Sequence, residues 1–561
     1  MAQLLQGYST NIETSMTSPA ATPPHHDHPA LAAARQALLD LPAPEPVPAV
    51  SMIAEGRLAI VGDLDAALGW AERLVAQRDV FVLASGPAVE LDPDLAFTVA
   101  FADHIALCGH LGAFELSWQQ QGQAVRQIAD VVLDLSPTAL LNRVELPPGY
   151  LAPGRDPLDQ ALAVIDLLAF DGEFEKPRYV TVNDRLCAHS RAQKAGCSNC
   201  IDSCASAAIR SDGEKIALDP YLCQGCGTCT TVCPSGALSF QYPRVADAGL
   251  ALKRQLQAWR EAGGGAPAIL FHSAESGSKA LATLQRQGRS LPADFITVEC
   301  WSADSVGLEL LLGAVAFGAC RVAVLGAGSH DLAPLRRQAV LGQAILGGLG
   351  FAGDYLRIVD SEADADWPAA LADWPAPAAL KPAEFRLLGD KRASLEFIID
   401  HLVKQSSAVP ESIELPAGAP FGSVAVSDAC TLCMACAGAC PAGALKAAAD
   451  APRLSFVERN CLQCGLCENT CPEQAITLTP RLLLKDRRHE RLLREAEVFC
   501  CTSCGKPMGA APTILNMISK LAGHSMFASP EAKARLSMCG DCRVVDLIQH
   551  EDGLKAREMT E

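Results

Sequence analysis

The cysteines of this chain fall into repeated runs with fixed spacing. Three runs read C-x2-C-x2-C-x3-C, and a proline follows each last cysteine, where its fixed φ turns the chain away from the loop. Thiolates are ligands for soft metals, and a tight loop of this spacing aims three sulfurs at one iron–sulfur cluster while the fourth reaches another cluster. Zinc sites or structural thiols are the alternative. The runs are Cys223, Cys226, Cys229 and Cys233; Cys430, Cys433, Cys436 and Cys440; and Cys461, Cys464, Cys467 and Cys471.

A fourth run departs from this spacing. Cys197, Cys200 and Cys204 keep the last two gaps, but Lys194 stands where the first cysteine is expected. Cys187, separated from Cys197 by nine residues, is the nearest replacement. All four runs are followed at the same offset by Ala and then Ile or Leu, so we interpret them as four copies of one unit.

Taken in pairs, the four runs resemble bacterial-type 2[4Fe-4S] ferredoxin domains over residues 178–243 and 422–480. In that family the fourth cysteine of each run ligates the cluster of the other run. The resemblance therefore implies four 4Fe-4S clusters with crossed ligands. The implied sets are Cys187, Cys197, Cys200 and Cys233; Cys223, Cys226, Cys229 and Cys204; Cys430, Cys433, Cys436 and Cys471; and Cys461, Cys464, Cys467 and Cys440.

The end of the sequence holds two further pairs, Cys501-x2-Cys504 and Cys539-x2-Cys542, with 34 residues between them. Two such knuckles can hold one ion tetrahedrally, which is the geometry of a zinc ribbon or of a rubredoxin-like iron. We expect zinc, with an iron site or metal-free thiols as alternatives. A helix at Thr513–Leu521 is expected to pack beneath this site.

The elements that flank the runs are predicted to be α/β in character. The turn Gly109-x-x-Gly112-x-Phe114 resembles a segment of flavin-containing heterodisulfide reductase subunits. A flavin site of that kind needs a glycine-rich turn after the first strand, but here Gly62 is followed by Asp63-Leu64-Asp65, whose carboxylates repel a diphosphate. We therefore expect a structural wing without FAD. Its expected elements are strands Leu58–Val61 and Val80–Ala84 and a helix at Asp65–Gln77.

Residues 265–360 alternate apolar strand and helix patterns, which predicts a parallel sheet. The stretch 314–328 resembles the delta subunit of methyl-viologen-reducing hydrogenase, a family in which this domain joins electron-transfer partners. Only Cys300 and Cys320 lie in the region, too few for a cluster. The expected strands are Ala268–Phe271, Phe295–Val298, Arg321–Leu325 and Leu356–Val359, and the expected helices are Val306–Phe317 and Leu332–Leu349.

Composition narrows the function classes further. The 561 residues carry a formal net charge of -18, which disfavours nucleic acid and anionic membranes as partners. No apolar run reaches the length of a spanning helix, and the first residues lack a basic start followed by an apolar block. Many unpaired CxxC runs favour a reducing compartment, so we expect a cytoplasmic protein without membrane insertion.

These observations predict a multidomain protein of α/β plus α+β class that relays single electrons to or from a partner dehydrogenase or reductase. Subunits of formate dehydrogenases or hydrogenase-linked complexes have a similar layout. A flavin-dependent oxidoreductase subunit and a cluster-donor scaffold are the alternatives. The expected regions are a flexible tail with a His25, His26 and His28 tract (1–55), the wing (56–177), ferredoxin module 1 (178–243), an α/β docking domain (244–365), a linker and helix (366–421), ferredoxin module 2 (422–485) and a CxxC/CxxC metal-binding, zinc-ribbon-like tail (486–561).

Overall fold

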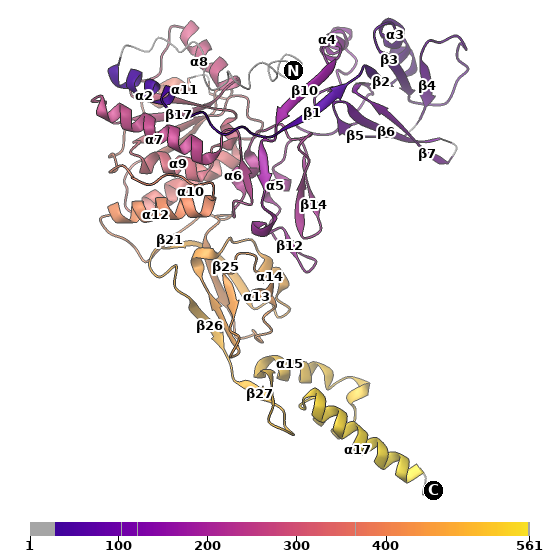
Figure 1. Cartoon of the computed structure of the whole chain (residues 1–561), viewed down its shortest axis with the longest axis vertical. Coiled ribbons are helices and arrows are strands. Elements are labelled where there is room, and N and C mark those ends of the chain that lie inside the picture. The colour runs from indigo at the N-terminus through magenta and orange to yellow at the C-terminus, as the bar shows by residue number, and fades with distance from the viewer. Residues whose placement is uncertain (1–27, 103, 121, 365, 559–561) are drawn as a thin grey trace.

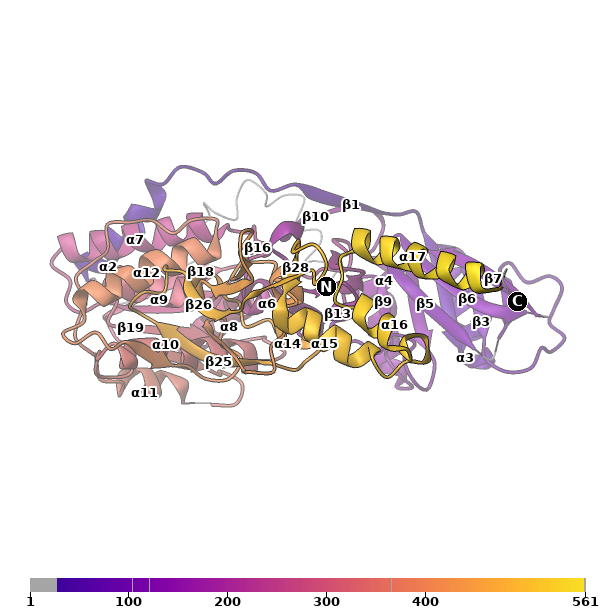
Figure 2. The same cartoon turned by 90° about the horizontal axis from the view of Figure 1, so that it is seen from below.

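The chain was analysed as a computed structural model, which describes residues 28–558 apart from Asp103, Gln121 and Ala365. The wing and the central α/β domain lie at opposite ends of an elongated upper body, with the two ferredoxin-like modules below and between them (Figures 1 and 2). The C-terminal segment extends away from module 2 as a separate arm (Figure 1). Among the described residues, no helix is both long and apolar enough to span a bilayer.

The wing is built on a parallel sheet in the order β4-β3-β2-β8-β9. The expected strands and helix are confirmed, although the helix ends three residues earlier than predicted. Beside the sheet lies an antiparallel one, in which Gly109 and Gly112 have positive φ and lie at a tight hairpin. The elements are β2 (Arg57–Gly62), α3 (Leu64–Leu74), β3 (Asp79–Ala84), β4 (Thr98–Phe101), β5 (Ile105–His110), β6 (Ala113–Gln120), β7 (Gln123–Ala129), β8 (Val131–Leu135), β9 (Tyr150–Leu151) and α4 (Pro157–Leu168).

The expectation of a flexible tail up to residue 55 is wrong for residues 28–55. Helix α2 (Pro29–Leu39) packs on α7 (Val245–Glu261) of the central domain, with Ala30 and Ala34 fully buried. The His28 ring stacks on Trp259 with the ring centroids 5.0 Å apart. Small alanine side chains let the two helices approach closely, and they carry too little apolar volume to predict such a contact. His25 and His26 lie outside the described residues.

The next strand also belongs to the folded body. β1 (Ala49–Ala54) pairs antiparallel with β10 (Gly172–Pro177), more than a hundred residues away in sequence. Its alternating side chains Val50, Met52 and Ala54 are buried. The N-terminal segment therefore connects the central domain to the wing.

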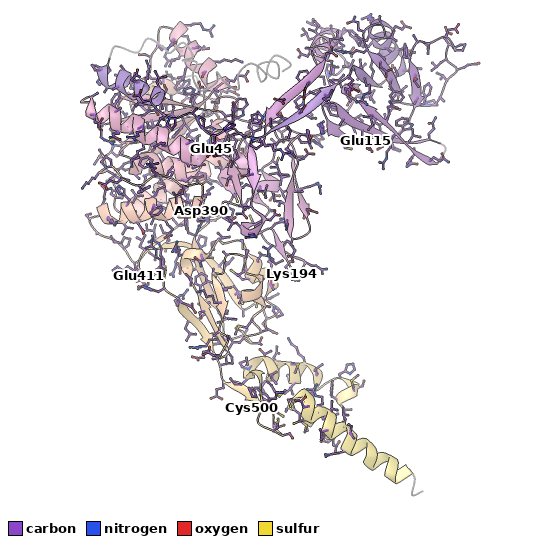
Figure 3. The ribbon with its side chains drawn as sticks, in the orientation of Figure 1. Glu45, Glu115, Lys194, Asp390, Glu411 and Cys500 are labelled. Carbon is purple, nitrogen blue, oxygen red and sulfur yellow. The ribbon has the colours of Figure 1, made fainter. Side chains whose placement is uncertain are left out.

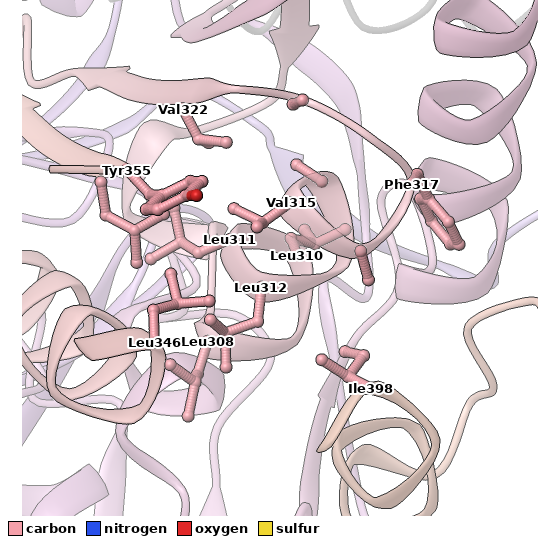
Figure 4. Close-up of a cluster of buried hydrophobic side chains, with 14 of the residues drawn as sticks. Leu308, Leu310, Leu311, Leu312, Val315, Phe317, Val322, Leu346, Tyr355 and Ile398 are labelled. Atoms are coloured by element: carbon pink, nitrogen blue, oxygen red, sulfur yellow. The ribbon is translucent and has the colours of Figure 1, made fainter. Parts of the chain in front are cut away.

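The central α/β domain has a four-stranded sheet in the order β18-β17-β19-β20, and every neighbouring pair is parallel, as predicted. Alternate residues of the strands face two cores, which helices α7, α9, α10 and α12 cover on one face and α8 and α11 on the other. Figure 4 shows α9 between the sheet and its neighbouring helices. The further elements are β17 (Ala268–Ser273), α8 (Ser276–Arg286), β18 (Phe295–Cys300), α9 (Leu308–Ala316), β19 (Arg321–Leu325), α10 (Ala333–Gly348), β20 (Leu356–Val359), α11 (Trp367–Ala372) and α12 (Lys391–Gln405).

The segment after residue 365 is not a linker. Trp367, Leu371 and Trp374 are buried in the core on one face of the central sheet, and α12 is buried on the other through Ile398 and Leu402. The alanines, prolines and aspartates of this segment suggested a linker, but its two tryptophans supply the apolar area that fixes it. The central domain therefore extends to about residue 405.

The two ferredoxin-like modules have matching elements: a long-range antiparallel pair, a short hairpin and one short helix at the end of each cysteine loop. In module 1 these are β11 (Val180–Val182) with β16 (Leu238–Phe240), β14 (Ile209–Asp212) with β15 (Lys215–Leu218), α5 (Asn199–Asp202) and α6 (Thr228–Val232). In module 2 they are β22 (Gly422–Val426) with β25 (Ile476–Leu483), β23 (Leu445–Ala447) with β24 (Arg453–Phe456), α13 (Ala435–Ala439) and α14 (Leu466–Thr470). Module 1 has an additional hairpin, β12 (Ser190–Arg191) with β13 (Lys194–Ala195).

The C-terminal arm follows β26 (Arg491–Glu495). Its predicted helix is present as α15 (Ala511–Leu521), and it contacts module 2: Thr513 Oγ1 donates to the carbonyl of Thr431 at 2.5 Å. The other elements of the arm are β27 (Val498–Cys500), β28 (Pro507–Ala510), α16 (Pro530–Arg535) and α17 (Gly540–Glu558).

Candidate iron–sulfur centres

In module 2 the structure brings the cysteines of the two runs together in crossed sets. One cavity is lined by the first three cysteines of the second run and by Cys440 of the first run. The other is lined by the first three cysteines of the first run and by Cys471 of the second. We call these site C (Cys440, Cys461, Cys464 and Cys467) and site D (Cys430, Cys433, Cys436 and Cys471). Four soft thiolate donors around one cavity fit a cubane cluster.

The thiols of module 2 also influence one another's ionisation. Burial, followed by the neighbouring thiolates of Cys430, Cys433 and Cys471, raises the pKa of Cys436 to about 12. Burial likewise raises the pKa of Cys461 to about 11, with Cys464 and Cys440 adding to it. Without a metal these thiols stay protonated, so an iron–sulfur cluster must displace their protons when it binds.

In module 1 the charges of four cysteines act on one another, and we call this set site B (Cys187, Cys197, Cys200 and Cys233). Burial, followed by the charges of the other three cysteines, raises the pKa of Cys200 to about 12. Cys187 is buried, and its charge adds to the raised pKa values of Cys197 and Cys200, so it lies close to both. The structure also explains the altered spacing, because the β12–β13 hairpin fills the gap and carries Lys194 on an exposed position at the edge of the module (Figure 3).

Site A consists of Cys204, Cys223, Cys226 and Cys229. Burial, followed by the thiolates of Cys226, Cys223 and Cys204, raises the pKa of Cys229 well above its ordinary value. Lys176 is buried beside this site, and its Nζ donates to the carbonyls of Tyr221 at 2.6 Å and Cys223 at 3.0 Å. Desolvation lowers the pKa of Lys176 to about 8.

The alanine that follows each run has a structural role that the sequence repeat did not reveal. The backbone N–H of Ala208 donates to Cys204 Sγ at 3.3 Å, and those of Ala444 and Ala475 donate to the fourth sulfur of their runs at 3.2 and 3.3 Å. In the remaining run the N–H of Ala237 donates to Ser235 Oγ instead. Such bonds orient the ligand that crosses to the other site.

The cysteine loops of the three intact runs have a left-handed residue before their helices, whereas Ser198 of the altered run has φ of -119°. Gly227 and Gly465 have φ of 83° and 80° directly after the second cysteine of their runs. Met434 adopts φ of 63° at the matching position, a conformation that costs a residue with a side chain more than it costs glycine. The third cysteine then lies in the first turn of a short helix.

The two modules meet directly at sites B and C. Leu466 of module 2 is fully buried and packs with Leu462 against Ala188 of module 1, and Cys197 and Cys464 flank this contact. Asn469 Nδ2 donates across the boundary to the carbonyl of Ala195 at 2.8 Å. The charge of Cys464 contributes to the raised pKa of Cys197, so a ligand of site B and a ligand of site C are near neighbours.

The C-terminal cysteines form a different kind of site. The ligand atoms of Cys501, Cys504, Cys539 and Cys542 all lie within 4.8 Å of one another, which suits a single ion. Cys504 Sγ and Cys539 Sγ are 3.7 Å apart. The backbone N–H of Cys539 donates to Cys501 Sγ at 3.2 Å and lowers the pKa of that thiol.

A buried carboxylate lies near site A, at the carboxyl edge of the central sheet. Burial raises the pKa of Asp304 to about 6, although Ser329 Oγ donates to Asp304 Oδ1 at 2.7 Å and opposes the shift. The charge of Glu145, whose Oε1 lies 2.9 Å from His330 Nε2, raises the pKa of Asp304 further. Cys300 also lies at this edge, and Cys320 is buried at the opposite end of the sheet.

Comparison with known protein families agrees with this geometry. Residues 195–237 match a model of the 4Fe-4S dicluster domain, and residues 429–476 match a second model with the same description. No curated protein matches the chain. The chain thus carries two 4Fe-4S dicluster domains, which points to an iron–sulfur electron-transfer role with two clusters in each domain. The first match begins after Cys187 and does not cover it.

Sequence reasoning missed the basic residues around the cysteine sites. Lys176, Arg191, Lys391 and Arg392 donate hydrogen bonds to backbone carbonyls of the cysteine loops. Two of them lie in α12, far from the runs in sequence, and no spacing pattern connects them to a cluster.

Proposed function

We propose that this protein is an electron relay in which four 4Fe-4S clusters form one path in the order A, B, C, D. The observation that carries this proposal is the contact between the modules, where Cys197 of site B and Cys464 of site C flank the same apolar cluster around Leu466. Within each module the crossed ligands join two sites, and the contact joins the modules. The function of the chain's own residues is to hold the clusters, to keep water out of the junction and to fix the order of the sites.

The two ends of this path have different surroundings. Site A lies against the central domain, where Thr231 Oγ1 donates to the carbonyl of Asp304 and a Cβ at Gly227 would lie 2.5 Å from Ser305 Cβ. At site D, Cys433 is exposed. We therefore propose that site D exchanges electrons with one partner protein. A second partner would dock on the surface formed by the wing and the central domain.

The partners are proposed from chemistry and resemblance. A central α/β domain similar to the hydrogenase delta subunit fits a docking role beside a formate dehydrogenase, a hydrogenase or another reductase. The net charge of -18 favours a basic docking surface on the partner, with association that weakens as salt rises. The unpaired thiols fit a reducing compartment such as the cytoplasm.

The remaining parts have supporting roles in this proposal. The four thiols of the arm would hold a structural zinc, in a ribbon-like site. In the wing, the side chain of Asp63 accepts a hydrogen bond from the N–H of Asp65 at the start of α3, and a Cβ at Gly62 would lie 2.8 Å from the backbone of Leu135. A diphosphate would have to occupy the same helix start, so the wing is assigned a structural role rather than a flavin site.

The relay is tested with the anaerobically purified, flavin-free protein. We expect dithionite to reduce it fully, because every cluster accepts a single electron. We expect negligible oxidation of NADH, NADPH or formate by the protein alone, and electron exchange at a salt-sensitive rate once its native partner is added. Robust dye reduction with NADH or NADPH by the isolated chain would overturn the relay assignment.

A further inference from the structure

Helix α12 begins with two basic residues whose side chains contact different modules. It starts directly after Asp390, which lies where the central domain meets module 2 (Figure 3), and the Asp390 side chain caps the helix by accepting from the N–H of Ala393 at 2.9 Å. Lys391 extends to module 1 and Arg392 to module 2. Because α12 is anchored in the central core through Leu395 and Ile398, these two charges are held at fixed positions.

The charge of Lys391 is compensated. Its Nζ donates to the carbonyls of Thr230 at 2.9 Å and Thr231 at 2.8 Å, in the helix between two cysteines of module 1. Glu309 Oε2 lies 3.6 Å from the same Nζ, and both side chains are more than nine-tenths buried. The pair therefore adds almost no net charge to module 1.

Among the described residues, Arg392 has no carboxylate at ion-pair distance, although the charges of Glu396 and Asp390 act on it from farther away. Its guanidinium donates to the carbonyls of Pro420 at 2.8 Å, Arg459 at 2.7 Å and Cys461 at 3.3 Å, and its central carbon lies 4.5 Å above the ring of Phe421. Within the described part of the chain, no carboxylate lies within 4.0 Å of it.

The carboxylate whose charge acts most strongly on Arg392 is shared with other arginines. Glu396, one turn along α12, forms ion pairs with three other arginines, at 3.5, 3.4 and 3.1 Å. These are Arg459, Arg487 and Arg488. Desolvation lowers the pKa of Arg392 to about 10, which still leaves it charged at neutral pH.

A cation that no ion pair neutralises shifts the redox equilibrium of a cluster beside it. Reduction adds one negative charge to the cluster, and a nearby positive charge that water does not screen stabilises the reduced form. Arg392 contacts the carbonyl of a ligand of site C and pairs with no described carboxylate within 4.0 Å, whereas Lys391 of the same helix is paired with Glu309.

We propose that Arg392 is a positioning residue that raises the reduction potential of a cluster held at site C. This inference rests on the proposed relay and names a residue that tunes one of its sites. A cluster at site C would be reduced more readily with the positive charge of Arg392 beside the carbonyl of Cys461 than without it. Lys391 holds α6 of module 1 in place. Because it is paired with Glu309, we do not expect it to shift the reduction potential of a cluster by a comparable amount.

The test is a redox titration followed by electron paramagnetic resonance on the full-length holoprotein. In Arg392→Gln we expect the reduction equilibrium of one cluster to fall by about tenfold or more, a shift of about 59 mV for a one-electron couple, with iron content unchanged. The affected signal is assigned by its loss in Cys461→Ser. Arg392→Lys should restore most of the shift, because it keeps the charge.

Two further variants separate charge from structure. Arg488→Gln makes the same change in charge at a half-exposed arginine that is already paired with Glu396 and Asp400, and we expect unchanged potentials. Glu309→Gln leaves Lys391 without its carboxylate, so a cluster of module 1 should become easier to reduce even if the Arg392 variants do not fold. Unchanged potentials in a folded Arg392→Gln holoprotein, or in Glu309→Gln where the Arg392 variants do not fold, would overturn the inference. Four intact clusters in those proteins would leave the relay itself standing.

Discussion

Replacing Leu466 with alanine should loosen the junction between the two modules without disturbing the cluster loop that contains it. Ala435 occupies the same position in the other run of module 2, so alanine is compatible with this loop. Leu466 itself is fully buried and packs against Ala188 of module 1, and a Cβ at Gly196 would lie 2.5 Å from its Cγ. The side chain therefore fills the space between the modules.

The expected magnitude follows from this burial. Burying a leucine side chain contributes about 1.5 to 3 kcal/mol, and truncating a buried leucine costs about 2 to 5 kcal/mol when a cavity remains. Some of the contacts of Leu466 are with its own module, so we expect the contact between the modules to lose at least about 1.4 kcal/mol, a tenfold change in its opening equilibrium.

Hydrogen exchange of the holoprotein measures this opening. The informative amides are those of Gly196 and Cys197, which donate to the carbonyls of His189 at 2.7 Å and Ala188 at 2.9 Å in module 1. We expect them to exchange about tenfold faster in Leu466→Ala, because the substitution in module 2 removes their cover. The matched control is Leu492→Ala, an exposed leucine of module 2. Equal exchange at Gly196 in both variants, or faster exchange confined to module 2, would refute the proposed junction.

Three further predictions concern the ligands and one buried carboxylate. Cys440→Ser should perturb the cluster of Cys461 and leave that of Cys430 intact, because the fourth ligand crosses over; Mössbauer spectra that show the reverse would contradict site C. Cys187→Ser should cost one cluster or convert it to a three-iron form, so an unchanged iron count and spectrum would remove Cys187 from site B. In the folded protein the pKa of the Asp304 carboxyl is raised from 3.8 to about 6, so the folded state loses stability as the pH rises through that window. Asp304→Asn should therefore stabilise the central domain by about 3 kcal/mol at pH 8 and by much less near pH 4. Calorimetry of both proteins across this range checks it, and a gain that does not vary with pH would contradict the assigned cause.

The sequence predicted the parts of the fold that have strong local patterns. The cysteine spacing identified the loops because ligand geometry constrains neighbouring residues, and the apolar runs at 268–271 and 321–325 marked strands that are buried on both faces. The alanine after each run was visible as a repeat, but its hydrogen bond to a sulfur was not.

Other parts were mispredicted or invisible for physical reasons. Alanine-rich α2 and the proline-rich segment around Trp367 have weak local signals, and contacts with residues distant in sequence fix both of them. The contact of Leu466 with Ala188 and the approach of Arg392 to Cys461 depend on how whole domains pack together. Spacing along a single chain carries no information about such contacts.

The most direct test of the four-cluster path is the anomalous scattering of iron from crystals of the anaerobically purified protein. We predict about 16 iron atoms per chain in four groups, two in each module, and the closest groups of different modules should be those ligated by Cys197 and Cys464. Fewer than four groups, or a different pair of groups at the boundary between the modules, would contradict the account.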